Sequence, residues 1–178
     1  GILQDYPAIA QRIHRQYRSF VVDEYQDVSA LQHHVLSLWL GGRHDICVVG
    51  DVAQTIYSFA GASPRYLQDF AQEHKGARVV QLVRDYRSTP QIVSAANTLM
   101  KGEHSSVLKG AVKLVSQRDD GVPVEYQSYA DDNDEAVGIA RQIRKLHDDG
   151  VSYSSIAILY RTNGQSENFE AQLSEAGV

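Results

Sequence analysis

The sequence lacks most of the features that mark secreted, zinc-stapled or membrane-spanning proteins. It holds a single cysteine, Cys47, which excludes both an internal disulfide and a CxxC zinc pair. No apolar run approaches the ~18 residues that cross a bilayer, and no basic flank with a signal-type apolar stretch opens the chain. We therefore expect a cytoplasmic protein with no membrane partner, and we expect Cys47, which lies in an apolar run, to pack in the interior.

Positive charge is also scarce. The chain has 17 Lys and Arg against 22 Asp and Glu, which gives a formal net charge of -5. Because non-specific nucleic-acid binding depends on neutralising phosphates with Lys and Arg, this balance argues against a general polyanion clamp and allows only local basic sites. A chain of 178 residues with 43% hydrophobic content can bury the core of one domain or of two small lobes.

Apolar, β-rich runs alternate with segments of helical period, a pattern typical of βαβ units and a mainly parallel sheet. The fold class predicted is therefore α/β. Strands are predicted at residues 20–22, 46–49, 78–83, 124–129 and 155–160. Helix starts are predicted by the capping-box pairs Ser29 with Gln32 and Thr162 with Gln165, and by Ser63-Pro64 and Thr89-Pro90; helix ends are predicted at Gly150 and Gly177.

The stretch "SFVVDEYQDVSALQ" places carboxylates directly after the strand predicted at residues 20–22. In open α/β sheets, ligands bind outside the carboxyl ends of the strands. There Asp23 could hold Mg²⁺, and a second carboxylate, Glu24, could take a proton from an attacking water, as in the Walker B arrangement of nucleotide hydrolases. The same residues, together with Asp27, also fit solvated strand-end and helix-cap positions.

Two further strand ends carry polar groups. The run 46–49 ends in Gly50-Asp51 with Gln54 close behind, and the run that ends at Val83 is followed by "RDYRSTP", which includes Arg87. Three successive strand ends thus offer acidic, amide and basic groups, a combination suited to a phosphate ester.

The stretches "VVDEYQD", "VVGDVAQTIYSFAGA", "VRDYRSTPQIVSAAN" and "IAILYRTNGQS" resemble consecutive motifs of the UvrD/PcrA/Rep helicases, which belong to superfamily 1 of DNA helicases. They occur in family order over Val21 to Ser166, and the first two look most like the UvrD-type enzymes of actinobacteria. The resemblance implies parts of two RecA-like parallel-sheet lobes with flanking helices. Residues 1–75 would form the back half of the first lobe and residues 76–178 the front half of the second, in a fragment of a bacterial cytoplasmic enzyme.

The resemblance also implies roles around ATP and Mg²⁺. Asp23 would hold the metal ion, Glu24 would polarise the attacking water and Gln54 would sense the γ-phosphate. Arg87, from the other lobe, would reach the γ-phosphate as an arginine finger with Tyr86 against the adenine, a role that can contribute ~10³ to 10⁵ in rate. If the family resemblance is set aside, Arg87 could simply form an ion pair with a nearby carboxylate such as Asp85.

Single-stranded DNA is the macromolecular partner that the resemblance implies, alongside DNA repair or replication proteins. Tyr57 and Phe59 would offer rings to the bases, and Arg161 and Asn163 would lie near the DNA path on the second lobe. At alternating positions, Tyr57 and Phe59 could equally pack one face of an extended segment.

The sequence departs from the family in one major respect. A phosphate-cradling loop of the form G-x-x-x-x-G-K-[ST] does not occur in it. Since phosphoryl transfer depends on positioning and electrostatic stabilisation of the phosphates, we expect no ATPase activity from this chain alone. Two smaller departures are Ala60, where many relatives carry Arg, and Asp85, which replaces a common Asn and could restrain Arg87.

Three functions therefore compete. The leading prediction is a fragment of an ATP-dependent DNA helicase or translocase of 3′ to 5′ polarity that serves DNA repair or replication. The first alternative is a non-catalytic module of a truncated relative that binds DNA or a protein partner. The second is a metal-dependent nuclease that uses Asp23, Glu24 and Asp51. This alternative would leave Gln54 and Arg87 without a role.

Overall fold

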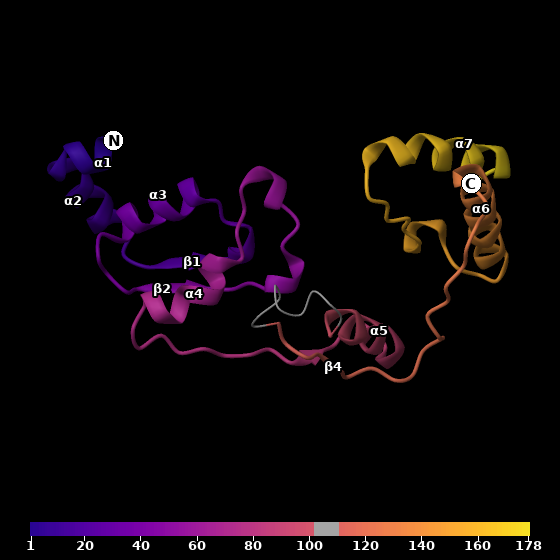
Figure 1. The fold of residues 1–178 in the computed structure, drawn as a ribbon, viewed down its shortest axis with the longest axis horizontal. Coiled ribbons are helices and arrows are strands. Elements are labelled where there is room, and N and C mark those ends of the chain that lie inside the picture. The colour runs from indigo at the N-terminus through magenta and orange to yellow at the C-terminus, as the bar shows by residue number, and fades with distance from the viewer. Residues whose placement is uncertain (102–110) are drawn as a thin grey trace. The chain divides into compact units, whose positions relative to one another are not determined.

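The computed structural model describes residues 1–101 and 111–178, which fall into two compact units, Gly1–Val124 and Glu125–Val178 (Figure 1). The first unit combines helices with two short parallel sheets, and the second is built around two helices. The predicted α/β class is therefore confirmed. None of the helices in the described ranges combines the length and apolar character needed to cross a membrane.

Helices, short strands and 3₁₀ turns (η) follow one another along the described residues. In the first unit they are α1 (Ile2–Asp5), α2 (Pro7–Gln16), β1 (Phe20–Val22), η1 (Tyr25–Asp27), α3 (Ala30–Leu40), β2 (Ile46–Val48), η2 (Val52–Gln54), η3 (Ser58–Ala60), α4 (Arg65–Glu73), β3 (Arg84–Asp85), α5 (Pro90–Met100) and β4 (Val115–Ser116). In the second unit they are α6 (Asp132–Asp148), η5 (Tyr153–Ser155), η6 (Asn163–Gln165) and α7 (Ser166–Ala176).

Strands β1 and β2 pair in parallel, with α3 between them in the chain, as a βαβ unit requires. Val21 lies opposite Cys47 in the register, and both side chains are exposed on the same face of the two-stranded sheet. Successive side chains of a strand point to opposite faces, so an apolar run does not by itself bury every residue. The prediction that Cys47 packs in the interior is wrong for this reason.

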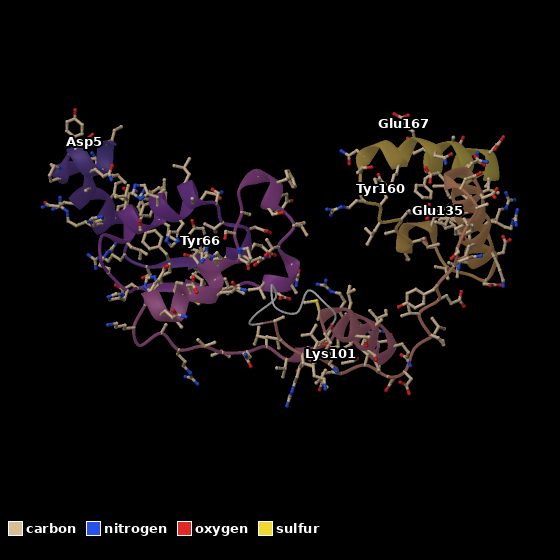
Figure 2. The ribbon with its side chains drawn as sticks, in the orientation of Figure 1. Asp5, Tyr66, Lys101, Glu135, Tyr160 and Glu167 are labelled. Carbon is tan, nitrogen blue, oxygen red and sulfur yellow. The ribbon has the colours of Figure 1, made fainter. Side chains whose placement is uncertain are left out.

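The interior of the first unit lies on the other side of this sheet, around Tyr25. Its side chain is buried, and its ring meets Phe70 of α4 edge to face with centroids 5.8 Å apart. Tyr66 of α4, labelled in Figure 2, stacks on His33 of α3 with centroids 4.2 Å apart. Burial raises the pKa of the Tyr25 hydroxyl, helped by the negative charge of Glu73. These contacts fix α3 and α4 around the residues that follow β1.

The guanidinium group of Arg43 stabilises the segment that leads into β1. Arg43 donates hydrogen bonds of 2.8–3.2 Å to five backbone carbonyl groups, which belong to His14, Tyr17, Arg18, Trp39 and Leu40. Several of these carbonyls lie at helix ends, where they have no partner within the helix. Arg43 thereby ties the end of α2, the approach to β1 and the end of α3 together.

The predicted helix starts are largely confirmed. Helix α3 begins with the Ser29 and Gln32 capping box, the Thr162 and Gln165 pair caps η6 directly before α7, and α5 begins at Pro90 after Thr89. Helix α4 begins at Arg65, one residue later than the Ser63-Pro64 pattern predicts.

Three of the five predicted strands are wrong. Residues 78–83, 124–129 and 156–160 have no strand assignment, and residue 155 ends η5. Directly after residues 78–83 the chain forms the short strand β3, which pairs in parallel with β4. An apolar segment forms a strand only where its backbone N–H and C=O groups find a neighbouring strand, and sequence pattern does not reveal that partner.

The second unit is held by its two long helices. The Asp131 side chain caps α6 by accepting the N–H groups of Asn133 and Asp134. Buried Ala136, Ala140 and Ile143 of α6 and Phe169 of α7 form the core of this unit. Tyr160, labelled in Figure 2, stacks on Phe169 with ring centroids 6.2 Å apart.

Candidate functional site

Glu24, which follows Asp23 at the end of β1, has an unusual backbone conformation. Glu24 lies in the left-handed region (φ 51°, ψ 41°) and is the one residue other than glycine with positive φ in the described ranges. Such a conformation costs free energy and persists only where the surroundings hold it. Three contacts do so: its N–H donates to Asp23 Oδ1 (2.9 Å), its C=O accepts from Asp27 N–H (2.9 Å), and its carboxylate accepts from Gln26 Nε2 (2.7 Å). The exposed Glu24 side chain is thus held in one place at the end of β1.

Gln26 connects the ends of the two strands. Its side chain is completely buried, at 0% exposed. Nε2 donates to the Glu24 carboxylate, and Oε1 accepts the backbone N–H of Asp51, directly after β2, at 3.0 Å. Chemistry fixes the orientation of this amide, because a carboxylate only accepts and a backbone N–H only donates.

The segment after β2 continues this network. Asp51 accepts Ala53 N–H at Oδ1 (3.0 Å) and Gln54 Nε2 at Oδ2 (3.1 Å). Asp27 Oδ1 accepts the N–H of Ile56 at 3.3 Å, so the acidic stretch is also bonded to the chain beyond Gln54. A chain of hydrogen bonds therefore runs from Glu24 through Gln26 and Asp51 to Gln54.

Gly50 makes the close approach of Gln26 possible. A Cβ atom at this position would lie 2.6 Å from Gln26 Oε1, 2.9 Å from Leu67 Cδ2 and 3.2 Å from Tyr25 N. Real Cβ atoms essentially never approach other heavy atoms closer than 3.0 Å. Glycine is thus needed here for space and not for backbone freedom, since its φ is not positive.

The donors present fit a magnesium ion shared with a phosphate substrate. Asp23 and Glu24 are exposed carboxylates at one strand end, and Mg²⁺ is usually held by one or two carboxylates together with substrate phosphates. Residues 1–101 and 111–178 contain no group of three or more His, Cys, Asp or Glu side chains arranged to hold a metal by themselves. Asp51, the third acid of the nuclease alternative, accepts one hydrogen bond at each carboxylate oxygen, from Ala53 N–H and from Gln54 Nε2.

Two exposed aromatic rings lie next to this site in the chain. Tyr57 is 50% exposed and Phe59 86% exposed, and their ring centroids are 6.0 Å apart. Neither ring lies in a strand, because Phe59 belongs to η3 and Tyr57 precedes it. The alternative in which both rings pack one face of an extended segment does not describe this geometry.

The turn between β3 and α5 carries the predicted arginine finger. Asp85 Oδ1 accepts hydrogen bonds from the backbone N–H groups of Arg87 (2.7 Å) and Ser88 (2.9 Å). These two bonds hold the pKa of Asp85 below its usual value, and the bond from Ser88 has the larger effect. Asp85 thus binds the backbone of Arg87, and the described ranges contain no ion pair between the two side chains. The Arg87 carbonyl accepts from Arg118 Nη1 (3.0 Å), while the side chains of Arg87 and Tyr86 are exposed.

Arg161 and Asn163 lie in the second unit, just before α7. Gln165 Oε1 accepts the N–H groups of Arg161 and Thr162, both at 3.0 Å. These bonds make the turn that carries Arg161 and Asn163, and both of their side chains are exposed.

The structure brings some of the predicted residues together. Asp23, Glu24 and Gln54 belong to one hydrogen-bonded network at the ends of β1 and β2. In the described residues no hydrogen bond or ion pair joins this network to Arg87. Sequence reasoning missed the central position of Gln26 and its neighbour Gly50. The sequence signal for them was an uncharged residue, Gln26, within the acidic stretch 23–27, and a glycine, Gly50, directly after the next predicted strand.

Two descriptions of helicase domains match the chain. The domain description "UvrD/REP helicase N-terminal domain" matches residues 1–75, and "UvrD-like helicase C-terminal domain" matches residues 80–178. The chain is 48% identical to the ATP-dependent DNA helicase UvrD2 of Mycobacterium tuberculosis over 171 residues, which cover 96% of this chain and 24% of that protein.

Two other relatives are more distant. The ATP-dependent DNA helicase UvrD1 of M. tuberculosis is 36% identical over 189 residues (100% of this chain, 24% of that protein), and PcrA of Leuconostoc citreum is 33% identical over 178 residues (99% and 23%). The chain thus spans about a quarter of the length of the relatives it matches. The likeness to mycobacterial proteins confirms the expected actinobacterial character of the motifs.

Proposed function

The chain belongs to the UvrD-like family of DNA helicases, and from that membership we propose that it is an internal segment of an ATP-dependent 3′ to 5′ DNA helicase or translocase. The observation that carries the proposal is the network from Glu24 to Gln54, which gathers the predicted water-polarising and phosphate-sensing groups at adjacent strand ends. We propose residues 1–75 and 76–178 as parts of two RecA-like lobes, supported by the extents of the two matched descriptions.

At the acidic strand end, each side chain has a separate task. Asp23 would hold Mg²⁺, which when bound offsets the negative charge of the phosphates. The Glu24 carboxylate, held by Gln26, accepts a proton from the water that attacks the terminal phosphate of the substrate. Gln54 presents its amide to that phosphate, and its bond to Asp51 keeps the amide at the strand end.

The exposed turn before α5 supplies the remaining groups for ATP. Arg87 would place its guanidinium against the charge that develops on the phosphoryl oxygens, and Tyr86, which is 70% exposed, would stack on the adenine. Asp85 accepts its hydrogen bonds from the backbone N–H groups of this turn and not from the guanidinium, which can therefore reach a substrate.

Single-stranded DNA would bind through rings and local basic groups. The exposed rings of Tyr57 and Phe59 offer stacking surfaces, which accept any base because every base has a π-face. Arg161 and Asn163 would contact the same strand from the second unit. This distribution fits a net charge of -5, because stacking requires no large basic surface.

The experiment that tests the proposal is ATP hydrolysis by the full-length protein that contains this chain, with and without single-stranded DNA. We expect Glu24→Gln to lower the DNA-stimulated kcat by about 10² to 10⁴-fold, since general-base catalysis contributes on this scale. Glu170→Gln, which removes an exposed carboxylate from α7, serves as the matched control and should leave kcat unchanged. Retention of the full rate by Glu24→Gln would refute the proposal.

The 178-residue chain alone should hydrolyse no ATP, because it has no G-x-x-x-x-G-K-[ST] loop to hold the phosphates. A DNA-stimulated rate from this chain that Glu24→Gln abolishes would contradict this expectation.

A further inference from the structure

Gln26 has a position that the proposed chemistry does not explain. A polar side chain with no exposed surface is costly to bury unless all its hydrogen-bonding groups are satisfied. Gln26 satisfies them with the Glu24 carboxylate at 2.7 Å, the Asp51 N–H at 3.0 Å and the Asp27 carboxylate at 3.5 Å. These partners lie at the ends of two different strands, so the amide spans the edge of the sheet.

Two of these partners, Glu24 and Asp51, lead to predicted catalytic groups. Glu24 itself is the predicted base, and Asp51 holds the Gln54 amide through Oδ2. The bond to Glu24 also helps to hold a left-handed backbone that would otherwise relax. Any shift of the Gln26 amide therefore moves the water-polarising carboxylate and the phosphate-sensing segment relative to each other.

We propose that Gln26 is a positioning residue, whose buried amide holds the Glu24 carboxylate in register with the Asp51–Gln54 segment. Because its side chain is fully buried, it does not reach the attacking water or the phosphate and acts through Glu24 and Asp51. The inference rests on the proposed function, since it assigns a catalytic task to Glu24. It adds that the geometry of the base depends on an uncharged residue buried behind it.

The test uses the full-length protein and the variant Gln26→Met, which keeps the length of the side chain and removes its three hydrogen bonds. We expect kcat for DNA-stimulated ATP hydrolysis to fall about 10- to 100-fold, because a displacement of ~1 Å in a catalytic group has effects of this size. The KM for ATP should change less than about threefold, since Gln26 does not bind the substrate.

A second readout is independent of activity. Amide hydrogen exchange at Asp51 should become faster in Gln26→Met, because its N–H loses its acceptor. The isosteric Gln26→Glu keeps an oxygen for Asp51 and sets a second carboxyl group against the Glu24 carboxylate, so that the two share a proton and Glu24 is no longer a free base. In this variant we expect the Asp51 amide to stay protected while kcat falls, which separates the two ends of the bridge.

Leu40→Ala is the control for lost stability alone, because Leu40 is buried at the end of α3 and takes no part in the network. At a temperature where all variants are folded, its kcat should match the wild type. The positioning role is wrong if Gln26→Met and Gln26→Glu both keep the wild-type kcat while Glu24→Gln loses it. If Glu24→Gln also keeps the wild-type rate, the proposed function itself fails.

Discussion

Replacing Gly50 with alanine would test how tightly the end of β2 packs against Gln26. The new Cβ would meet Gln26 Oε1 at 2.6 Å and Leu67 Cδ2 at 2.9 Å. Gln26 is fully buried, so its amide cannot move aside without leaving the N–H of Asp51. The backbone of Gly50 itself is not in the left-handed region, and the cost of the substitution is therefore steric.

The expected loss of stability combines two effects. Overpacking of a filled interior costs about 1–3 kcal/mol, and loss of a buried hydrogen bond adds about 1 kcal/mol. We therefore expect Gly50→Ala to lower the free energy of unfolding of the first unit by about 2–4 kcal/mol.

Trp39 provides the assay because it is the single tryptophan of the chain. It stacks on Tyr17 with ring centroids 5.7 Å apart and contacts Phe20 of β1, so its fluorescence follows unfolding of the first unit in urea. Gly42→Asn is the comparison, because its Cβ would meet nothing within 4 Å and its cost comes from the φ of +81° alone, which asparagine adopts more readily than most residues. We expect this backbone strain to cost about 1 kcal/mol, less than the steric cost at Gly50. Equal midpoints for Gly50→Ala and Gly42→Asn would refute the packing described for this strand end.

Other side chains allow further tests. Arg43→Lys should lower the free energy of unfolding by about 1.5–3 kcal/mol, because an ammonium group cannot donate to five carbonyl groups. Trp39 fluorescence in urea measures this change, and an unchanged midpoint would show that these bonds contribute nothing. The lowered pKa of Asp85 means that its stabilisation is present above its usual value of 3.8 and is lost as the pH falls through its folded value. The deficit of Asp85→Asn in urea unfolding should therefore be largest near neutral pH and vanish in acid; a deficit independent of pH would contradict this. In the full-length protein, Phe59→Ala should weaken single-stranded DNA binding by about 1–3 kcal/mol without lowering stability, whereas Leu31→Ala, also exposed, should leave DNA affinity unchanged.

Local patterns in the sequence predicted local structure well. The Ser29 and Gln32 capping box, the Thr89-Pro90 start of α5 and the strand at residues 20–22 all form as predicted. These features depend on residues within a few positions of one another, so the sequence carries the whole signal. The prediction failed for residues 78–83, because a strand requires a partner that is distant in sequence.

The sequence by itself determined the family, the order of its motifs and the acidic, amide and basic strand ends, since residue type and spacing define them. Only the tertiary structure decided how these groups are held. Gln26 and Asp51 are 25 residues apart in the chain, and the parallel pairing of β1 and β2 brings them within hydrogen-bonding distance. The tight space at Gly50 depends on that pairing too, because Tyr25 and Gln26, which follow the neighbouring strand, approach it closely.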